Sequence, residues 1–120
     1  MSRGSSIIAA VVRRLALALP EAVESSHFAQ PDFRVRNRIF ATLMRDGRTV
    51  CLKTTPANVD ALVTADSGTF RDEWRGRWLG VRLDRVTRPV LRDLLVHAWQ
   101  LAAPKRLAAR FRQARRLTSA

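Results

Sequence analysis

Apolar and polar positions alternate between Phe33 and Thr54 in a way that predicts a β-hairpin. Asp46-Gly47 lies between two runs rich in β-branched and apolar residues, and an Asp-Gly pair favours a two-residue type I′ turn. Such a loop places Leu43 opposite Val50 and sets the register of the whole hairpin. We therefore expect this segment to form the centre of a sheet.

The predicted hairpin has two different faces. We expect the more apolar face to be buried, and it consists of Ile39, Ala41, Leu43, Val50 and Leu52. The second face mixes aromatic, polar and basic side chains, and it consists of Phe40, Thr42, Met44, Cys51 and Lys53. A mixed face of this kind indicates more than a plain solvent-exposed surface.

Further strands are expected before and after the hairpin, because short extended runs there are bounded by turn residues. Pro31 is confined to a connection, since proline cannot donate a hydrogen bond to a strand ladder. In the last of these strands Trp78 and Arg82 would join the mixed face. The strands are predicted near residues 23–28, 33–35, 70–74 and 78–83.

The turn at Arg36-Asn37 leads into the hairpin, and its length decides the register. A two-residue loop would set Arg34 opposite Ile39 and bring a charge onto the buried face. Three loop residues would instead pair Val35 with Ile39. We expect the three-residue loop or a β-bulge.

Four helices are predicted from apolar residues that recur every three to four positions. Thr55 and Pro56 open the second helix, with threonine as N-cap and proline at the first helical position. The helices are expected at about residues 5–19, from Pro56 until Asp66-Ser67-Gly68, from Thr87 to Pro104, and from Lys105 to about Leu117. The element order is α, four strands, α, two strands, α, α, in one domain spanning residues 1–120.

The net charge of +12 and the pI near 11.8 point to a partner that carries phosphates. Twenty of the 22 basic residues are arginine, as expected if the codons favour G and C. This preference does not change the charge itself. Nucleic acid is therefore the leading candidate for the partner.

One cysteine and two histidines are too few for a disulfide framework or a structural zinc site. Arg13 and Arg14 divide the apolar N-terminal run, which excludes a continuous signal-peptide core, and no run reaches the roughly 20 residues of a membrane span. We expect a cytoplasmic protein, a monomer, that holds no metal or cofactor and does not bind a membrane.

Several ordered motifs are similar to one family of small bacterial proteins. These are LALALPEAVESSHF, PDFRVRNRIFATL, VCLKTTP, WLGVRL and LAAPKRLA. From about Val12 to Ala109 the chain thus resembles the MmcQ/YjbR family. The resemblance implies an α+β, CyaY-like fold, an antiparallel sheet of about six strands with helices packed on one face. It also implies a double-wing arrangement, proposed to bind DNA through the open face of the sheet.

The resulting hypothesis is a non-enzymatic protein that binds the phosphate backbone of duplex DNA. Arginines at the hairpin ends and at the start of the last helix would contact phosphates, while aromatic residues would line the open face. The expected DNA-binding residues are Arg34, Arg36, Arg38, Phe40, Thr42, Arg45, Arg48, Lys53, Trp78, Arg82, Lys105 and Arg106. The alternative is a module that binds a peptide or a small anion on the same face.

Residues suited to catalysis are few. Ser25, His27 and Asp32 lie close in the sequence, but a triad is recognised by geometry, and neighbouring strand positions need not meet. A structural role for His27 near a sheet edge, and for His97 on the third helix, is expected instead. No Gly-rich phosphate loop or HExxH motif occurs. We therefore expect no enzymatic activity.

Overall fold

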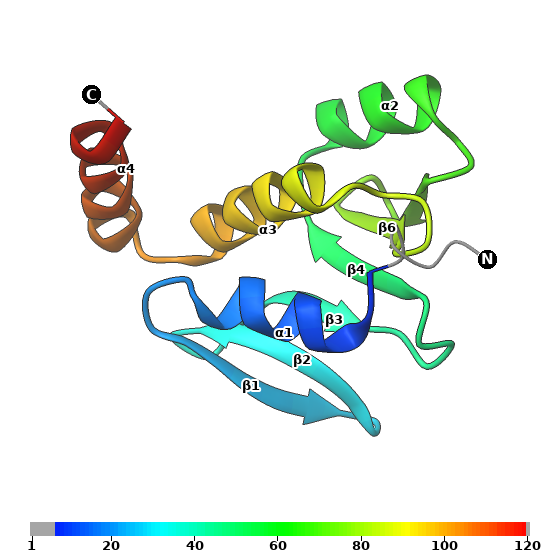
Figure 1. Ribbon diagram of the computed structural model, residues 1–120, viewed down its shortest axis with the longest axis horizontal. Helices are drawn as coiled ribbons and strands as arrows, with labels where there is room; N and C mark the ends of the chain where they lie inside the picture. Colours follow the sequence, from blue (N-terminus) through cyan, green and yellow to red (C-terminus); the bar gives the residue numbers. More distant parts are fainter. Residues whose placement is uncertain (1–6, 120) are drawn as a thin grey trace.

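The structure, a computed structural model, describes residues 7–119 and has the expected α+β architecture (Figure 1). Six antiparallel strands form one sheet in the order β1-β2-β3-β4-β6-β5. The strands are β1 (Ala22–His27), β2 (Gln30–Val35), β3 (Arg38–Leu43), β4 (Thr49–Lys53), β5 (Phe70–Trp74) and β6 (Trp78–Arg82). The helices are α1 (Ala9–Leu17), α2 (Pro56–Ala65), α3 (Arg88–Ala102) and α4 (Lys105–Ser119).

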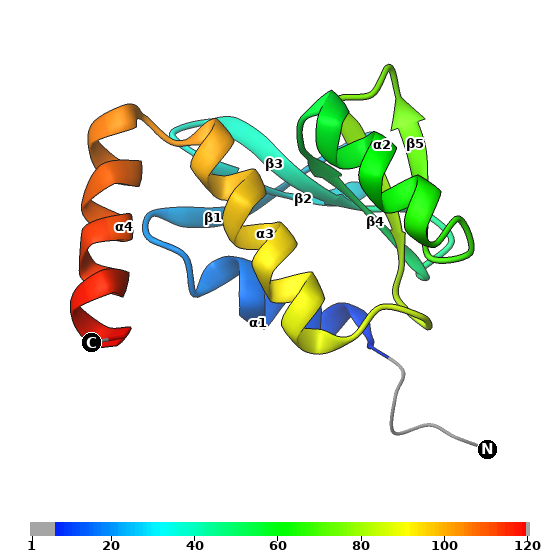
Figure 2. The same ribbon diagram turned by 90° about the horizontal axis from the view of Figure 1, so that it is seen from above.

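Helices α1 and α3 cover one face of the sheet, and α2 lies beside β5 (Figure 2). The core between these layers includes Phe33, Leu52, Leu79, Leu95 and Trp99, each almost fully buried. Strands β2, β3, β4 and β6 send alternate side chains into this core, as half-covered strands do. Within residues 7–119 the opposite face of the sheet carries no helix, so the expectation of helices on one face is confirmed for α1 and α3.

The β3–β4 hairpin has the predicted register, with Leu43 opposite Val50. Its turn is not type I′, because Gly47 has a positive φ of 67° but Asp46 does not. The Asp46 carboxylate instead accepts hydrogen bonds from the backbone N–H groups of Arg48 and Thr49 and from the Thr49 hydroxyl. These hydrogen bonds from the turn to its own aspartate stabilise it without the second left-handed residue that a type I′ turn requires.

The β2–β3 connection differs from the prediction, and this difference changes which side chains of β3 face the core. Arg36 and Asn37 both have positive φ, so the loop has two residues, and Arg34 pairs with Ile39. A register shift follows between Phe33 and Arg34, and this bulge turns Phe40 into the core beside Ala41.

The expectation that Phe40 lies on the open face and contacts DNA is therefore wrong, because its side chain is fully buried. Ile39, expected in the core, lines the open face instead. The three-residue loop was also wrong, whereas the alternative of a bulge is confirmed.

The helix starts agree with the capping predictions in part. The Thr55 hydroxyl accepts a hydrogen bond from the Asn58 N–H, and Pro56 is the first residue of α2. Thr87 occupies the N-cap position of α3 without a side-chain cap hydrogen bond. Helix α1 spans Ala9–Leu17, which is shorter than predicted, and the expected start at Ser5 lies outside the described residues.

Helix α4 is attached to the end of α3 by aromatic and aliphatic side chains. The rings of Trp99 and Phe111 lie 4.9 Å apart, and Leu107 and Ala108 are buried. The Trp99 indole N–H donates to the Pro20 carbonyl at 2.9 Å, which ties the same region to the α1–β1 turn. The apolar side chains in the first half of α4 are thus used for packing.

Candidate functional site

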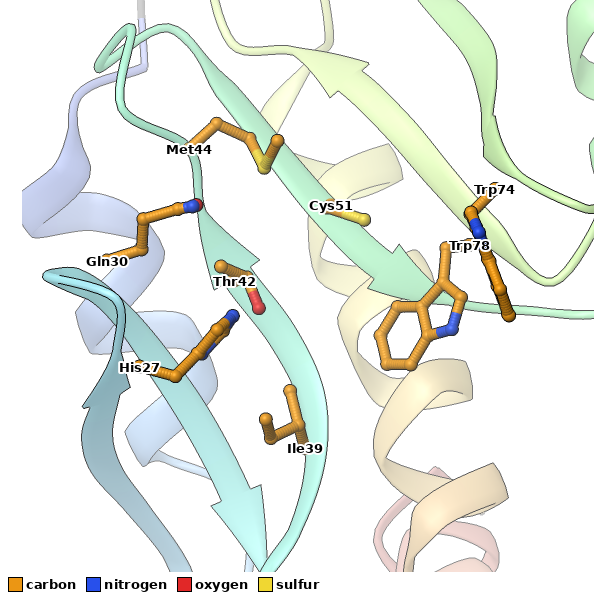
Figure 3. Close-up of a pocket in the computed structure, with 8 residues that line it drawn as sticks. All are labelled: His27, Gln30, Ile39, Thr42, Met44, Cys51, Trp74 and Trp78. Carbon is orange, nitrogen blue, oxygen red and sulfur yellow. The ribbon is translucent and has the colours of Figure 1, made fainter.

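The open face of the sheet is hollowed into a pocket of about 320 Å³ (Figure 3). Thr42 and Cys51, from the central strands β3 and β4, lie in its middle. His27 and Gln30 stand on the side of the β1–β2 hairpin, whereas Trp74 and Trp78 stand on the side of β5 and β6. Apolar atoms dominate the lining, to which Ile39 and Met44 also contribute.

A cation lies beside each tryptophan of this wall. The Lys53 ammonium is 5.2 Å from the centroid of the Trp78 ring, and the Arg75 guanidinium is 5.0 Å from that of Trp74. Both separations are within the range of cation–π attraction. Trp74 pairs with Trp78 across the β5–β6 hairpin, and its side chain is 55% exposed. The wall therefore combines aromatic surface with positive charge.

On the opposite wall of the pocket, the buried carboxylate of Asp32 orients the neighbouring side chains. Asp32 accepts two hydrogen bonds from the Arg34 guanidinium, at 2.8 and 3.0 Å, and one from His27 Nδ1 at 2.7 Å. Burial alone would raise the pKa of Asp32, but these hydrogen bonds outweigh it and hold the pKa below its usual value. Because an ionised carboxylate only accepts, His27 Nδ1 must donate, and a neutral His27 leaves Nε2 as an acceptor.

His27 and Asp32, which lie close together in the sequence, thus meet in the structure, and Ser25 is the cross-strand neighbour of Asp32. The His27 ring is oriented by Asp32, and it lines the pocket. Among the hydrogen bonds of residues 7–119, His27 contacts Asp32 and no serine hydroxyl, whereas a Ser-His-Asp triad requires the base to bond the nucleophile. Within residues 7–119, no group of three His, Cys, Asp or Glu side chains could hold a metal ion.

Arginines elsewhere on the sheet are also paired with carboxylates. Arg82 contacts Asp84 at 2.8 Å, and Arg71 contacts Glu73 at 2.7 Å. The latter pair lies over Gly80, where a Cβ atom would come within 2.6 Å of the Glu73 carboxylate. The contact with Asp84 already engages the charge of Arg82, which the sequence assigned to DNA.

The β-turns hold further expected contact residues. Arg36 forms an ion pair with Glu21, and Arg38 is exposed next to it. At the other end of the hairpin, Arg45 donates to the Phe28 carbonyl at 2.9 Å, and Arg48 is exposed. Arg38 and Arg48 are therefore better placed for a partner than Arg36 and Arg45.

Cys51, in the middle of the pocket, is a neutral thiol. Burial is the main cause that raises its pKa, to about 12, and the nearby Glu73 carboxylate adds to the effect. Nucleophilic catalysis needs the thiolate, so this cysteine contributes apolar surface at neutral pH.

Helix α4 is the most strongly charged element. It carries six of the chain's 22 basic residues and no acidic residue, which accounts for six of the twelve excess positive charges. Five of the six are exposed, namely Lys105, Arg106, Arg110, Arg112 and Arg116. The charge of Arg110 acts on Glu21, the partner of Arg36, so α4 and the β2–β3 turn lie at the same end of the molecule.

The structure therefore brings together only some of the residues predicted to bind DNA. Thr42 and Trp78 line the pocket with Lys53 beside them, whereas Lys105 and Arg106 belong to α4. Sequence reasoning missed Trp74, Gln30 and His27. Trp74 could have been identified from the sequence, because Trp74 and Trp78 flank the β5–β6 turn and therefore pair across it.

Among the helices of residues 7–119, none combines the length and apolar character that a bilayer crossing requires. The exposed cations of α4 make that helix the least apolar of the four.

Comparison with known proteins supports the fold. A family model described as YjbR matches residues 17–101, so the predicted resemblance is confirmed over that range. The crystal structure of a Deinococcus radiodurans protein with a domain described as DUF419 is similar, with a TM-score of 0.66 and 24% identity. The similarity covers 75% of this chain and 74% of that protein. No curated protein matches the sequence.

Proposed function

We propose that this chain, which belongs to the YjbR family, is a non-enzymatic protein that binds the phosphate backbone of duplex DNA. In this proposal it acts as a monomer in the cytoplasm. The family match ends at residue 101, before α4. The proposal therefore rests on the charge of this chain rather than on the family.

The concentration of positive charge on α4 is the observation that carries the proposal. A helix with six basic and no acidic residues has no carboxylate of its own to neutralise them. Phosphates are the complementary partner, because neutralising them releases counterions from DNA. Arg38, exposed at the β2–β3 turn near this end of the molecule, can extend the same surface.

The packing of α4 favours DNA over a membrane surface. An interfacial helix needs an apolar face to insert among lipids. In α4 the apolar side chains of Leu107 and Ala108 are buried, and Phe111 packs at a tilt against Trp99, whereas Leu117 is exposed near the end of the helix. The exposed part of the helix offers mainly charge, which suits a phosphate backbone.

The sheet face has a smaller part in this proposal than the sequence implied. Arg34 and Arg82 are held by Asp32 and Asp84, and Phe40 is buried. Lys53, Arg45 and Arg48 at its edges remain candidates for additional phosphate contacts.

A mobility-shift titration of a duplex over a series of salt concentrations tests the proposal. If about six phosphates are neutralised, log affinity falls with log salt at a slope near −5, with little dependence on DNA sequence. Anionic vesicles serve as the competing surface. Absence of duplex binding at low salt, or tighter binding to the vesicles, contradicts the proposal. Affinity that disappears near physiological salt favours the alternative of a peptide-binding or small-anion-binding module.

A further inference from the structure

We propose that the pocket on the open sheet face is a separate binding site for a small planar aromatic acid that carries an N–H or O–H donor. This inference does not rest on DNA binding, because the charges on α4 play no part in it and Lys53 is the one residue that both proposals use. The pocket volume of about 320 Å³ lies at the lower end of the roughly 300–1,000 Å³ range of ligand pockets. It suits one or two fused rings with a short substituent.

The lining selects an apolar, flat ligand. Trp78, Trp74 and Ile39 present carbon surface from three strands, and Met44 adds a flexible thioether at one end (Figure 3). Cys51 remains a neutral thiol and adds to this surface. Indole rings favour other rings in stacked or edge-on contact, which is worth more than the apolar area alone.

One polar atom in the lining requires a donor. Gln30 Oε1 is buried, and it has no hydrogen-bond partner among the described residues. Buried acceptors in native proteins are nearly always satisfied, and because Gln30 lines the pocket, a rotation of its amide would bring this oxygen to a ligand donor. His27 Nε2 is a second acceptor in the lining when the ring is neutral, because Asp32 contacts only Nδ1. A ring N–H or hydroxyl on the ligand can satisfy Gln30.

Charge at the rim selects an acid. Lys53 and Arg75 stand beside the two tryptophans, whereas no acidic residue lines the pocket. The carboxylates near it are already engaged, Asp32 by Arg34 and Glu73 by Arg71. A carboxylate on the ligand would therefore meet two cations, while the carboxylates nearest the pocket are each paired with an arginine.

A nucleobase of bound DNA fits the pocket less well. Bases carry several donors and acceptors around the ring, and each one buried without a partner lowers affinity. The pocket offers few polar groups, namely His27, Gln30 and Thr42. A ring with a single donor and a carboxylate matches this small number better.

The test uses indole-3-carboxylate as the probe and the full-length ¹⁵N-labelled protein. The chain has three tryptophans, so it gives three indole N–H signals, which single Trp→Phe variants assign. We expect saturable shifts of the Trp74 and Trp78 signals. The Trp99 signal stays unchanged as an internal control, because that indole is buried and donates to Pro20.

Two related probes test the chemical class. Indole lacks the carboxylate, and 1-methylindole-3-carboxylate lacks the N–H donor. Each is expected to bind about tenfold more weakly than the parent compound, because one charge-assisted contact or one satisfied buried acceptor is lost. Equal affinity for all three probes overturns the assignment.

Variants then locate the site. Replacing Lys53 and Arg75 by Gln is expected to weaken indole-3-carboxylate binding about tenfold and to leave indole binding unchanged. Arg38→Gln with Arg48→Gln removes the same charge from exposed positions that do not line the pocket, and is expected to have no effect. Gln30→Leu is expected to abolish the preference for indole-3-carboxylate over 1-methylindole-3-carboxylate. This variant leaves the tryptophans unchanged.

Three outcomes overturn the proposal. The first is a uniform shift of all three tryptophan signals, and the second is unchanged affinity in both the rim variant and Gln30→Leu. The third is a shift of the Trp74 and Trp78 signals by a single-stranded DNA oligomer but not by indole-3-carboxylate, which would assign the pocket to a nucleobase. The mobility-shift result on duplex DNA is independent of all three.

Discussion

On the open sheet face each of three arginines contacts a carboxylate two residues away in the chain. The pairs are Arg34 with Asp32, Arg71 with Glu73, and Arg82 with Asp84. Helix α4 has six basic residues and no acidic one, with five of the six exposed. These three arginines of the sheet are thus neutralised around an apolar pocket, whereas the five exposed cations of α4 have no carboxylate on their own helix.

This difference shows that a net charge of +12 does not by itself locate a binding surface. Arginines beside carboxylates stabilise the fold and orient neighbouring side chains, as Asp32 does for His27. Arginines without such neighbours are available for phosphates. The two regions should therefore respond differently to substitution, one mainly in stability and the other mainly in DNA affinity.

Phe40→Ala is the substitution with the largest expected effect. Because the side chain is fully buried in the core, its loss leaves a cavity and should destabilise the protein by about 4 kcal/mol. Urea unfolding monitored by circular dichroism measures the change. Trp74→Ala, at an exposed aromatic residue of the sheet, is the control and should change stability far less. A small effect of Phe40→Ala would contradict the bulge that buries it.

Asp32→Asn is expected to have the second largest effect. It should lower the free energy of unfolding by about 3 kcal/mol, because it removes the charge of a buried ion pair while keeping the shape of the side chain. DNA affinity of the folded variant should stay within about twofold of the wild type, since the contacts to phosphate lie elsewhere. Asp84→Asn, at an exposed pair, is the matched control, and a much smaller change in unfolding free energy is expected. Equal changes in unfolding free energy would mean that the buried Asp32–Arg34 pair stabilises the fold no more than the exposed Asp84–Arg82 pair does.

Replacing Arg106, Arg112 and Arg116 by Gln tests the other region. Losing three phosphate contacts should lower duplex affinity about 100-fold near 0.15 M salt and reduce the salt slope from about −5 to between −2 and −3. Unfolding free energy should change little, because these side chains are exposed.

The control for this variant carries the same loss of charge on other helices. Arg14, Arg88 and Arg92 are exposed residues of α1 and α3, and their replacement by Gln leaves α4 intact. A similar fall in affinity in both triple variants would mean that net charge, rather than α4, determines binding.

The smallest expected effect is on the response to acid. The folded-state pKa of Asp32 is depressed, so its contribution to stability is complete above the unfolded pKa of about 3.9 and is lost as pH falls through the folded pKa. Between pH 5 and pH 3 the wild type should therefore lose more unfolding free energy than Asp32→Asn. Urea titrations at both pH values measure the difference, and equal losses in the two proteins would contradict the depressed pKa.

Much of the fold follows from local sequence signals. The Asp46-Gly47 pair predicted the β3–β4 register, and Thr55-Pro56 predicted the start of α2. The bulge near Phe40 could not be predicted in the same way, because alternation in sequence does not reveal where two successive residues share a face. The position of this bulge depends on the tertiary packing of the Phe40 side chain.

The candidate site was predictable to a smaller extent. Thr42 and Trp78 were assigned to the correct face, and the ion pairs could have been found, since residues two apart on a strand share a face. The pocket itself depends on how the β1–β2 and β5–β6 hairpins lie relative to each other. Such a long-range arrangement leaves no short motif, so Gln30 and His27 carried no signal of their role.

The attachment of α4 has an evolutionary consequence. The helix lies beyond the matched residues 17–101 and reaches the core mainly through Leu107, Ala108 and Phe111. Its outward positions can therefore exchange basic, neutral and acidic residues while the three anchors keep it in place. Selection could raise or lower the affinity for polyanions along this helix in single steps without passing through unstable intermediates.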